Sequence, residues 1–146
     1  MEGIDRPFLG LDYGDRTVGV SISDPLGMMA HGIETIHQDR PGKLRKTLAR
    51  IEALVQDRNV KGIVLGLPLL ADGAEGERCE KTREFGALLG KRLKLPILYQ
   101  DERLSTREAY EYMRESGVPA AKREGMVDEV AAVIILQDYL DSHGRN

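Results

Sequence analysis

The sequence predicts an α/β fold in which a mixed five-stranded sheet carries helices on both of its faces. Short apolar runs rich in β-branched residues begin the chain and recur at its centre, which is typical of buried strands. Segments with apolar residues at helical spacing separate the later runs, and helical connections of this kind join parallel strands. The chain has 146 residues, the usual size of one domain, so we expect residues 1–146 to form a single domain.

An antiparallel meander forms the first half of the predicted sheet. Residues 7–13 include a short apolar run, and residues 17–23 alternate valine and isoleucine with small residues. The turn signal Gly14-Asp15 lies between these segments and predicts a hairpin. A third strand over residues 30–36 is expected to extend the meander.

Two units of helix and parallel strand are predicted to follow the meander. Residues 42–57 and 78–93 have apolar residues at helical spacing and should form amphipathic helices. Strands are expected over residues 62–66 and 96–100. Because a helix precedes each of these strands, we expect them to be parallel to a neighbouring strand, although the pattern does not fix the strand order.

Two further helices complete the predicted fold. The capping-box pattern at residues 105–108 predicts a helix that begins directly after the last strand. The apolar run at residues 130–136 predicts a final helix over residues 127–141, largely buried against the sheet. Pro119 interrupts the chain before it, and residues 122–125 are expected to be mobile.

The composition is that of an ordinary globular protein. Hydrophobic residues make up 41% and charged residues 31% of the chain, which argues against disorder or a fibrous class. No segment approaches the roughly 20 apolar residues of a membrane helix, and no leader-like segment is seen, so we expect a cytoplasmic protein without membrane contact. The single cysteine, Cys79, is expected to be a buried thiol in a reducing compartment. The formal net charge of -3 means that cations for nucleic-acid binding would have to gather around one site.

Carboxylates at the ends of predicted elements are the first candidates for chemistry. Asp12 ends an apolar strand, where a desolvated carboxylate requires a partner. Asp101 and Glu102 end a parallel strand, at the edge where open α/β sheets bind ligands. Only one of these two neighbours can face Asp12, because adjacent strand residues point to opposite faces. Asp128 lies at the start of the most apolar helix, on the side that should be buried.

Each of these carboxylates also has a purely structural explanation. Asp12 would stabilise the turn that follows it. Asp101 would pair with a neighbouring arginine while Glu102 is solvated. Asp128 would interact with the helix dipole in the first turn, an effect of about 0.3 to 1 kcal/mol. The sequence leaves these alternatives open.

Convergence of the carboxylates in one cleft would predict a bound divalent metal ion. Carboxylates that share a cleft raise one another's pKa unless a cation neutralises them. Ligands that are all oxygen favour Mg²⁺ or Mn²⁺, with Asp12, Glu102 (or Asp101) and Asp128 as the catalytic acids and Asp12, Glu102 and Asp128 as the expected metal ligands. Two such ions about 3.5 to 4 Å apart activate water and stabilise the leaving oxygen in phosphodiester hydrolysis. If the carboxylates converge, the site would therefore be suited to phosphodiester hydrolysis by two metal ions.

Four parts of the chain match the motifs of a known family in order and spacing. These parts are Phe8–Gly14 with Val18–Asp24, Gly66–Leu69 with Asp72–Gly76, Asp101–Thr106, and Val127–Ala132 with Ile135–Gln137. Together they resemble the YqgF/RuvX-type family of pre-16S rRNA nucleases, also described as Holliday-junction-resolvase-like. The resemblance implies an RNase H-like fold, a metal-dependent nuclease reaction and a role in maturing the 5′ end of small-subunit rRNA in ribosome biogenesis. By matching motif positions, Asp12, the Asp101-Glu102 pair and Asp128 would form the acidic site.

One departure concerns the central strand that ends at residues 65–67. Related resolvases carry their second carboxylate on the corresponding strand, whereas this strand has no acid. The acidic site is therefore incomplete on that strand when compared with the resolvases.

Basic residues close in sequence to the acids are candidates for contacts to backbone phosphates. These candidates are Arg16, Arg103, Arg107, Lys122 and Arg123. The loop over residues 66–77 contains three glycines and three acids, and we expect a mobile flap beside the cleft. The alternative is an ordinary surface connection.

We expect the partner to be nucleic acid, namely structured RNA such as pre-rRNA, and the protein to be a monomer or a homodimer. One alternative is a resolvase-like nuclease that acts on branched DNA. Another is a non-catalytic RNA-binding factor for ribosome assembly. A nucleotide-binding domain like those of actin-like ATPases is the fourth possibility, but that fold normally requires two such domains.

Overall fold

The structure is a computed structural model that describes residues 7–38, 40, 43–102 and 105–143. Five strands and four helices lie within this described part. In chain order they are β1 (Phe8–Tyr13), β2 (Thr17–Ser23), β3 (Ala30–His37), α1 (Arg45–Arg58), β4 (Gly62–Leu67), α2 (Glu77–Leu93), β5 (Ile97–Asp101), α3 (Ser105–Glu115) and α4 (Ala120–His143).

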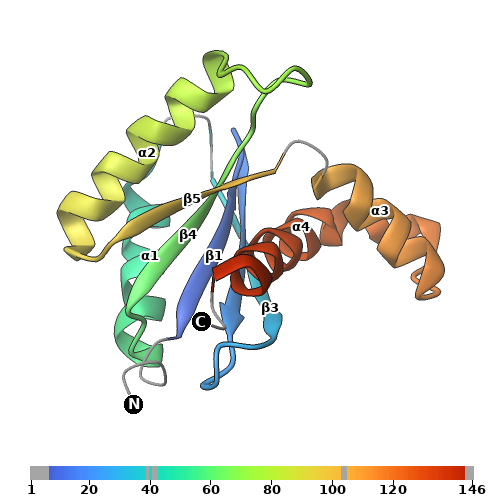
Figure 1. Cartoon of the computed structure of the whole chain (residues 1–146), viewed down its shortest axis with the longest axis horizontal. Helices are drawn as coiled ribbons and strands as arrows, with labels where there is room; N and C mark the ends of the chain where they lie inside the picture. Colours follow the sequence, from blue (N-terminus) through green and yellow to red (C-terminus); the bar gives the residue numbers. More distant parts are fainter. Residues whose placement is uncertain (1–6, 39, 41–42, 103–104, 144–146) are drawn as a thin grey trace.

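The strands form one mixed sheet in the order β3-β2-β1-β4-β5 (Figure 1). β1 and β2 pair antiparallel, as do β2 and β3. β4 pairs parallel with β1, and β5 pairs parallel with β4. The predicted meander and parallel units are confirmed. The chain crosses from β3 to the far side of β1, so β1 is the central strand.

Helices cover both faces of the sheet, as predicted, with α1 and α2 on one face and α4 on the other (Figure 1). The side chains of successive residues in β1 point to opposite faces of the sheet. Leu9 and Leu11 are fully buried in one cluster with Phe85 of α2. Gly10 lies against α4, and Asp12, two residues further on, shares that face.

α4 lies close to the backbone of the sheet because glycines leave room for it. A Cβ atom on Gly10 would lie 2.7 Å from the Cβ of Leu136, which is too close for two carbon atoms. A Cβ atom on Gly19 would overlap the backbone carbonyl of Asp128. Glycine at these two positions therefore allows the close approach that brings Asp128 over the end of β1.

The prediction for the start of the last helix was wrong. α4 begins at Ala120 rather than at Val127, so residues 122–125 are helical rather than a mobile connection. The early part of α4 packs against α3, where Val127 joins a buried cluster with Ala109 and Met113. This packing extends the helix through a polar stretch that carries no apolar periodicity.

Cys79 is a free and fully buried thiol in α2, as predicted. Its surroundings are those of a small core residue. Within the residues that the structure describes, no helix is both long and apolar enough to cross a membrane.

Candidate active site

A cavity of ≈ 350 Å³ at the carboxyl end of β1 brings the three predicted acids together. Its lining comes from both ends of the chain and from the middle. The lining residues are Asp12, Tyr13, Gly14, Pro68, Leu69, Arg78, Glu102, Thr106 and Asp128. Asp12, Glu102 and Asp128 are far apart in sequence, so the fold alone gathers them.

Asp12 is half-buried at the end of β1, on the face that α4 covers. Gly19 is its neighbour in register on β2, so no β2 side chain separates Asp12 from the helix. Burial raises the pKa of Asp12 to about 6, and the negative charge of Asp128 adds to this effect. A side-chain hydrogen bond with Glu102 and the positive charge of Arg78 act in the opposite direction. Burial is therefore the main reason that the Asp12 carboxyl group holds its proton more tightly than an exposed aspartate does.

The turn after β1 is held without the Asp12 side chain. The backbone N–H of Gly14 donates to the carbonyl of Thr17 at 2.9 Å. The side-chain amide of Gln38 donates to the carbonyls of Gly14 and Asp15 at 3.1 and 3.3 Å. Turn stabilisation therefore does not account for the aspartate at position 12.

Asp128 projects from the interior of α4, which begins at Ala120. The favourable effect of an acid at a helix N-terminus is confined to the first turn, so the helix dipole does not account for this residue. The hydroxyl of Thr17 donates a hydrogen bond to Oδ2 of Asp128. This bond ties the carboxylate to the start of β2, beside the cavity.

Glu102 lines the cavity, whereas Asp101 is exposed at the end of β5 and does not. The backbone N–H of Glu102 donates to the carbonyl of Leu67 at 3.1 Å, which continues the β4–β5 pairing past the strand. A Cβ atom on Gly66 would lie 2.7 Å from Oε1 of Glu102. The carboxylate of Glu102 therefore occupies the space above β4, the strand that itself has no acid.

Arg78 was not among the candidates from the sequence. It lies in the first turn of α2, lines the cavity with the acids and lowers the pKa of Asp12 through its charge. No local pattern around residue 78 distinguishes it from other arginines. Only the position of α2 beside the end of β1 reveals it.

The described basic residues that were predicted to contact phosphates do not line this cavity. They are Arg16, Arg107, Lys122 and Arg123. Arg123 donates from Nε to the carbonyl of Val118 at 3.0 Å, and Nε of Arg107 lies 3.7 Å from a carboxylate oxygen of Glu111. Arg103 lies outside the described residues. Contact between these residues and a substrate stays a prediction.

The loop between β4 and α2 borders the cavity through Pro68 and Leu69. Backbone hydrogen bonds form a turn over residues 70–74. Glu75 accepts two hydrogen bonds from the guanidinium of Arg83, at 2.8 and 2.7 Å. These bonds give the loop a defined shape, and its motion as a flap stays a prediction.

The donor set of the cavity fits a hard divalent cation. Three carboxylates supply only oxygen ligands, which Mg²⁺ and Mn²⁺ prefer. Burial and the charge of Asp128 raise the pKa of Asp12, and a cation bound beside this carboxylate would lower it again. In the described part of the chain, no group of three or more His, Cys, Asp or Glu side chains is already arranged to hold a metal ion. The chemistry of the cavity is thus suited to a metal, although a ready-made cage of ligands is not present among these residues.

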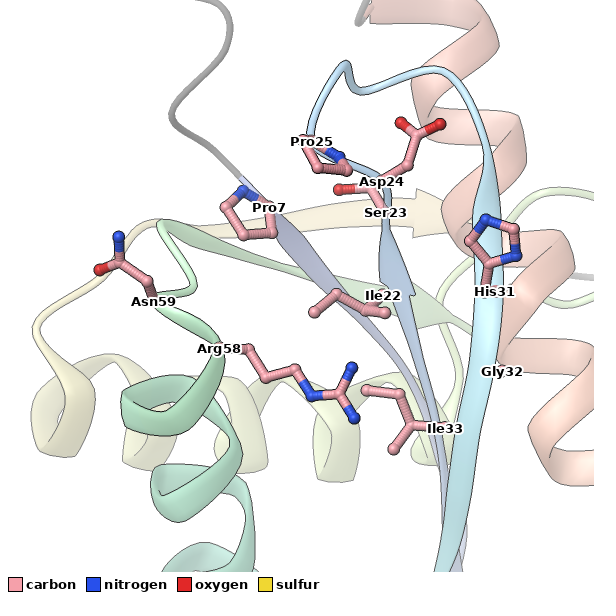
Figure 2. Close-up of a pocket in the computed structure, with 10 residues that line it drawn as sticks. All are labelled: Pro7, Ile22, Ser23, Asp24, Pro25, His31, Gly32, Ile33, Arg58 and Asn59. Carbon is pink, nitrogen blue, oxygen red and sulfur yellow. The ribbon is translucent and has the colours of Figure 1, made fainter.

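A larger cavity of ≈ 770 Å³ lies at the opposite end of the sheet (Figure 2). Apolar side chains of the sheet and polar groups share its lining. Figure 2 shows the side chain of Arg58 reaching from α1 towards Ile22 and Ile33. None of the predicted acids lies there, so this cavity is separate from the candidate active site.

Comparison with known proteins identifies close relatives over most of the chain. A family model described as "RuvX: Holliday junction resolvase" matches residues 6–142. A protein of Agathobacter rectalis named "Putative pre-16S rRNA nuclease" is 50% identical over 133 residues, which cover 91% of this chain and 93% of that protein. A protein of Halothermothrix orenii with the same name is 47% identical over 137 residues, which cover 94% and 96% of the two chains.

Solved structures show the same fold at low sequence identity. A Thermus thermophilus RuvC chain in complex with a Holliday junction substrate superposes with a TM-score of 0.58 at 12% identity, covering 94% of each chain. Another RuvC structure from Thermus thermophilus gives a TM-score of 0.57 at 11% identity, covering 93% of this chain and 95% of that one. The RNase H-like fold predicted from the sequence is thereby confirmed. With the family model and these relatives spanning more than nine-tenths of its length, the chain belongs to the RuvX family.

Proposed function

We propose that the protein is a metal-dependent nuclease that hydrolyses phosphodiester bonds in the precursor of 16S rRNA. The observation that carries this proposal is the cavity in which the carboxylates of Asp12, Glu102 and Asp128 meet. The names of the relatives support both the reaction and the substrate. Asp101, which does not line the cavity, is the less suitable of the two neighbouring acids.

Asp12, Glu102 and Asp128 would hold Mg²⁺ or Mn²⁺, because all three offer carboxylate oxygens to one space. Such ions, when bound as a pair, supply an activated water and stabilise the charge of the leaving oxygen. Asp12 would contribute the central carboxylate of this set, since it interacts with both Glu102 and Asp128.

Two contacts beside the cavity fix parts of its wall. The hydroxyl of Thr17 orients Asp128 through its hydrogen bond. The ring of Tyr13 stacks on Phe85, with ring centroids 4.0 Å apart, and so fixes the end of β1 beside Asp12. A site held in this way loses little free energy to reorganisation when a substrate binds.

Substitution of Asp12 by asparagine tests the proposal, with Asp57→Asn as the matched control. Asp57 is exposed on α1 and lines neither cavity. Wild-type protein should cleave an RNA that spans the 5′ end of precursor 16S rRNA when Mg²⁺ or Mn²⁺ is present. D12N should lose activity by about 100-fold or more, the loss typical for a group that stabilises transition-state charge, and D57N should keep it. Cleavage by D12N at the wild-type rate would overturn the proposal.

A four-way DNA junction is the second candidate substrate. It is favoured by the description of the family model and by the shared fold with the RuvC chain bound to a Holliday junction. Cleavage of the precursor RNA and of a DNA junction under one metal condition separates the two substrates. Protein that binds the RNA but cuts neither substrate with any divalent metal would instead support the non-catalytic assembly factor.

A further inference from the structure

A nucleic-acid strand that approaches the acidic cavity meets the negative charge of three carboxylates. Its phosphates are repelled unless fixed cations lie along the approach. In the part of the chain that the structure describes, α2 supplies the basic residues that line this cavity and the smaller cavity beside it. They are Arg78 and Lys81.

The smaller cavity has a volume of ≈ 100 Å³ and shares part of its lining with the acidic cavity. Tyr13, Gly14 and Arg78 line both, so the two spaces lie side by side with Arg78 between them. Lys81 and Thr82 complete the α2 side of the smaller cavity. Residues 78, 81 and 82 share one face of the helix because of their spacing.

Unlike the other arginines of α2, Arg78 makes no hydrogen bond or ion pair within the described residues, although its charge acts on Asp12 across the cavity. Arg83 donates two hydrogen bonds to Glu75, at 2.8 and 2.7 Å. Arg92 donates two to Glu52, at 3.1 and 2.9 Å. The guanidinium of Arg78 therefore keeps its donors available, and a guanidinium suits a phosphate because two N–H groups can bind two oxygens together.

Lys81 is only weakly engaged by its own helix. Its Nζ lies 3.9 Å from Oε2 of Glu77, and the two side chains are 53% and 82% exposed. Exposed pairs of this kind contribute little, so a phosphate competes easily for the ammonium. Among the described residues that line the smaller cavity, Asp15 is the single acid, against the two cations Arg78 and Lys81. The smaller cavity thus favours an anion, in contrast to its acidic neighbour.

We propose that Arg78 and Lys81 form a subsite that binds a backbone phosphate adjacent to the bond that is cleaved. This inference rests on the proposed nuclease function, because it takes the acidic cavity as the place of cleavage. The ligand is a phosphodiester of RNA or DNA, recognised through its charge and its oxygens. Binding at this subsite positions the strand and carries no base preference.

Binding can be measured with cleavage suppressed by placing every variant in the D12N background. The test variant is R78A/K81A, and the control K61A/K91A removes the same charge from exposed positions that line neither cavity. The probes are a fluorescein-labelled RNA spanning the 5′ end of precursor 16S rRNA and a labelled four-way DNA junction. Anisotropy titrations between about 50 and 200 mM salt give the Kd and its salt dependence.

We expect R78A/K81A to weaken binding by about 10-fold and to reduce the slope of log K against log salt by about 1, as the loss of one phosphate contact requires. K61A/K91A should change neither quantity. Weaker binding of both probes by R78A/K81A identifies a subsite that accepts either RNA or DNA backbone. Weaker binding of the RNA probe alone identifies a subsite for RNA. Equal Kd and slope for R78A/K81A and K61A/K91A on both probes would overturn the inference.

Cleavage assays on variants that keep Asp12 distinguish this inference from the nuclease proposal. R78A/K81A should raise KM more than it lowers kcat, and R78K should recover part of the loss. Suppose that wild-type protein cleaves and that R78A/K81A binds and cleaves as K61A/K91A does. The phosphate-subsite inference is then wrong, whereas the nuclease proposal is supported. If wild-type protein never cleaves but R78A/K81A still loses binding, the nuclease proposal is wrong and a phosphate site remains.

Discussion

Asp12 is kept in the cavity at a cost to folding. Its pKa is about 6 in the folded protein, mainly because of burial, against an ordinary value of 3.8. Between these two values the folded state binds more protons than the unfolded state, so the free energy of unfolding falls as the pH rises through this range. Above pH 6 the full cost is present, at most about 3 kcal/mol by the relation of about 1.4 kcal/mol for each pH unit.

The variant D12N should therefore be more stable than wild-type protein at pH 7.5 without divalent metal. We expect a gain of about 1 to 3 kcal/mol in the free energy of unfolding, measured by urea denaturation. The gain should shrink towards zero at pH 4, where Asp12 is largely protonated in the folded protein. The control D57N should show no such gain. A lower free energy of unfolding for D12N than for wild-type protein at pH 7.5 would show that burial of the charged Asp12 carboxylate does not destabilise the fold.

The bond from Thr17 to Asp128 predicts a role for a residue that touches neither substrate nor metal in our proposal. Thr17→Val keeps the shape but removes the donor, so Asp128 loses its orientation. Cleavage should fall by about 10-fold or more, as for other groups that orient metal ligands, and Thr17→Ser should restore most of it. Cleavage by T17V at the wild-type rate would show that this hydrogen bond does not orient Asp128.

The approach of α4 to the sheet depends on small residues at the contact. A Cβ atom at position 19 meets the backbone of α4, which cannot move aside as a flexible side chain can. Gly19→Ala should therefore lower the free energy of unfolding by about 3 kcal/mol, as overpacking does. The matched control is Gly125→Ala within α4, where a Cβ atom meets nothing within 4 Å. This control should stabilise the protein by about 0.5 to 1 kcal/mol through helix propensity. Urea denaturation that ranks the two variants in the opposite order would contradict this account of the contact.

Most elements could be predicted because their own residues carry the signal. β2 alternates apolar and small residues along its length, and α3 begins at Ser105, where the capping-box spacing places it. The start of α4 could not be found in this way. Pro119 looks like an interruption, yet its carbonyl accepts the N–H of Lys122 at 2.9 Å, and proline is well suited to the beginning of a helix.

At the scale of the whole molecule, strand order decides which residues meet. β1, β4 and β5 are parallel, so their carboxyl ends lie at one edge and bring Asp12 near Glu102. α4, which lies near the C-terminal end of the sequence, adds Asp128 to this edge. The acids could be predicted because charged residues stand out in apolar segments. Arg78 could not, since it stands out only after the sheet order places α2 beside β1.

The central claim is that Asp12, Glu102 and Asp128 together bind a hard divalent cation. Anomalous diffraction from a crystal soaked in Mn²⁺ tests it most directly. We expect an anomalous peak in the acidic cavity, within coordination distance of carboxylate oxygens from these three residues. A saturated crystal with no peak in this cavity, or with manganese bound only elsewhere, would contradict the account.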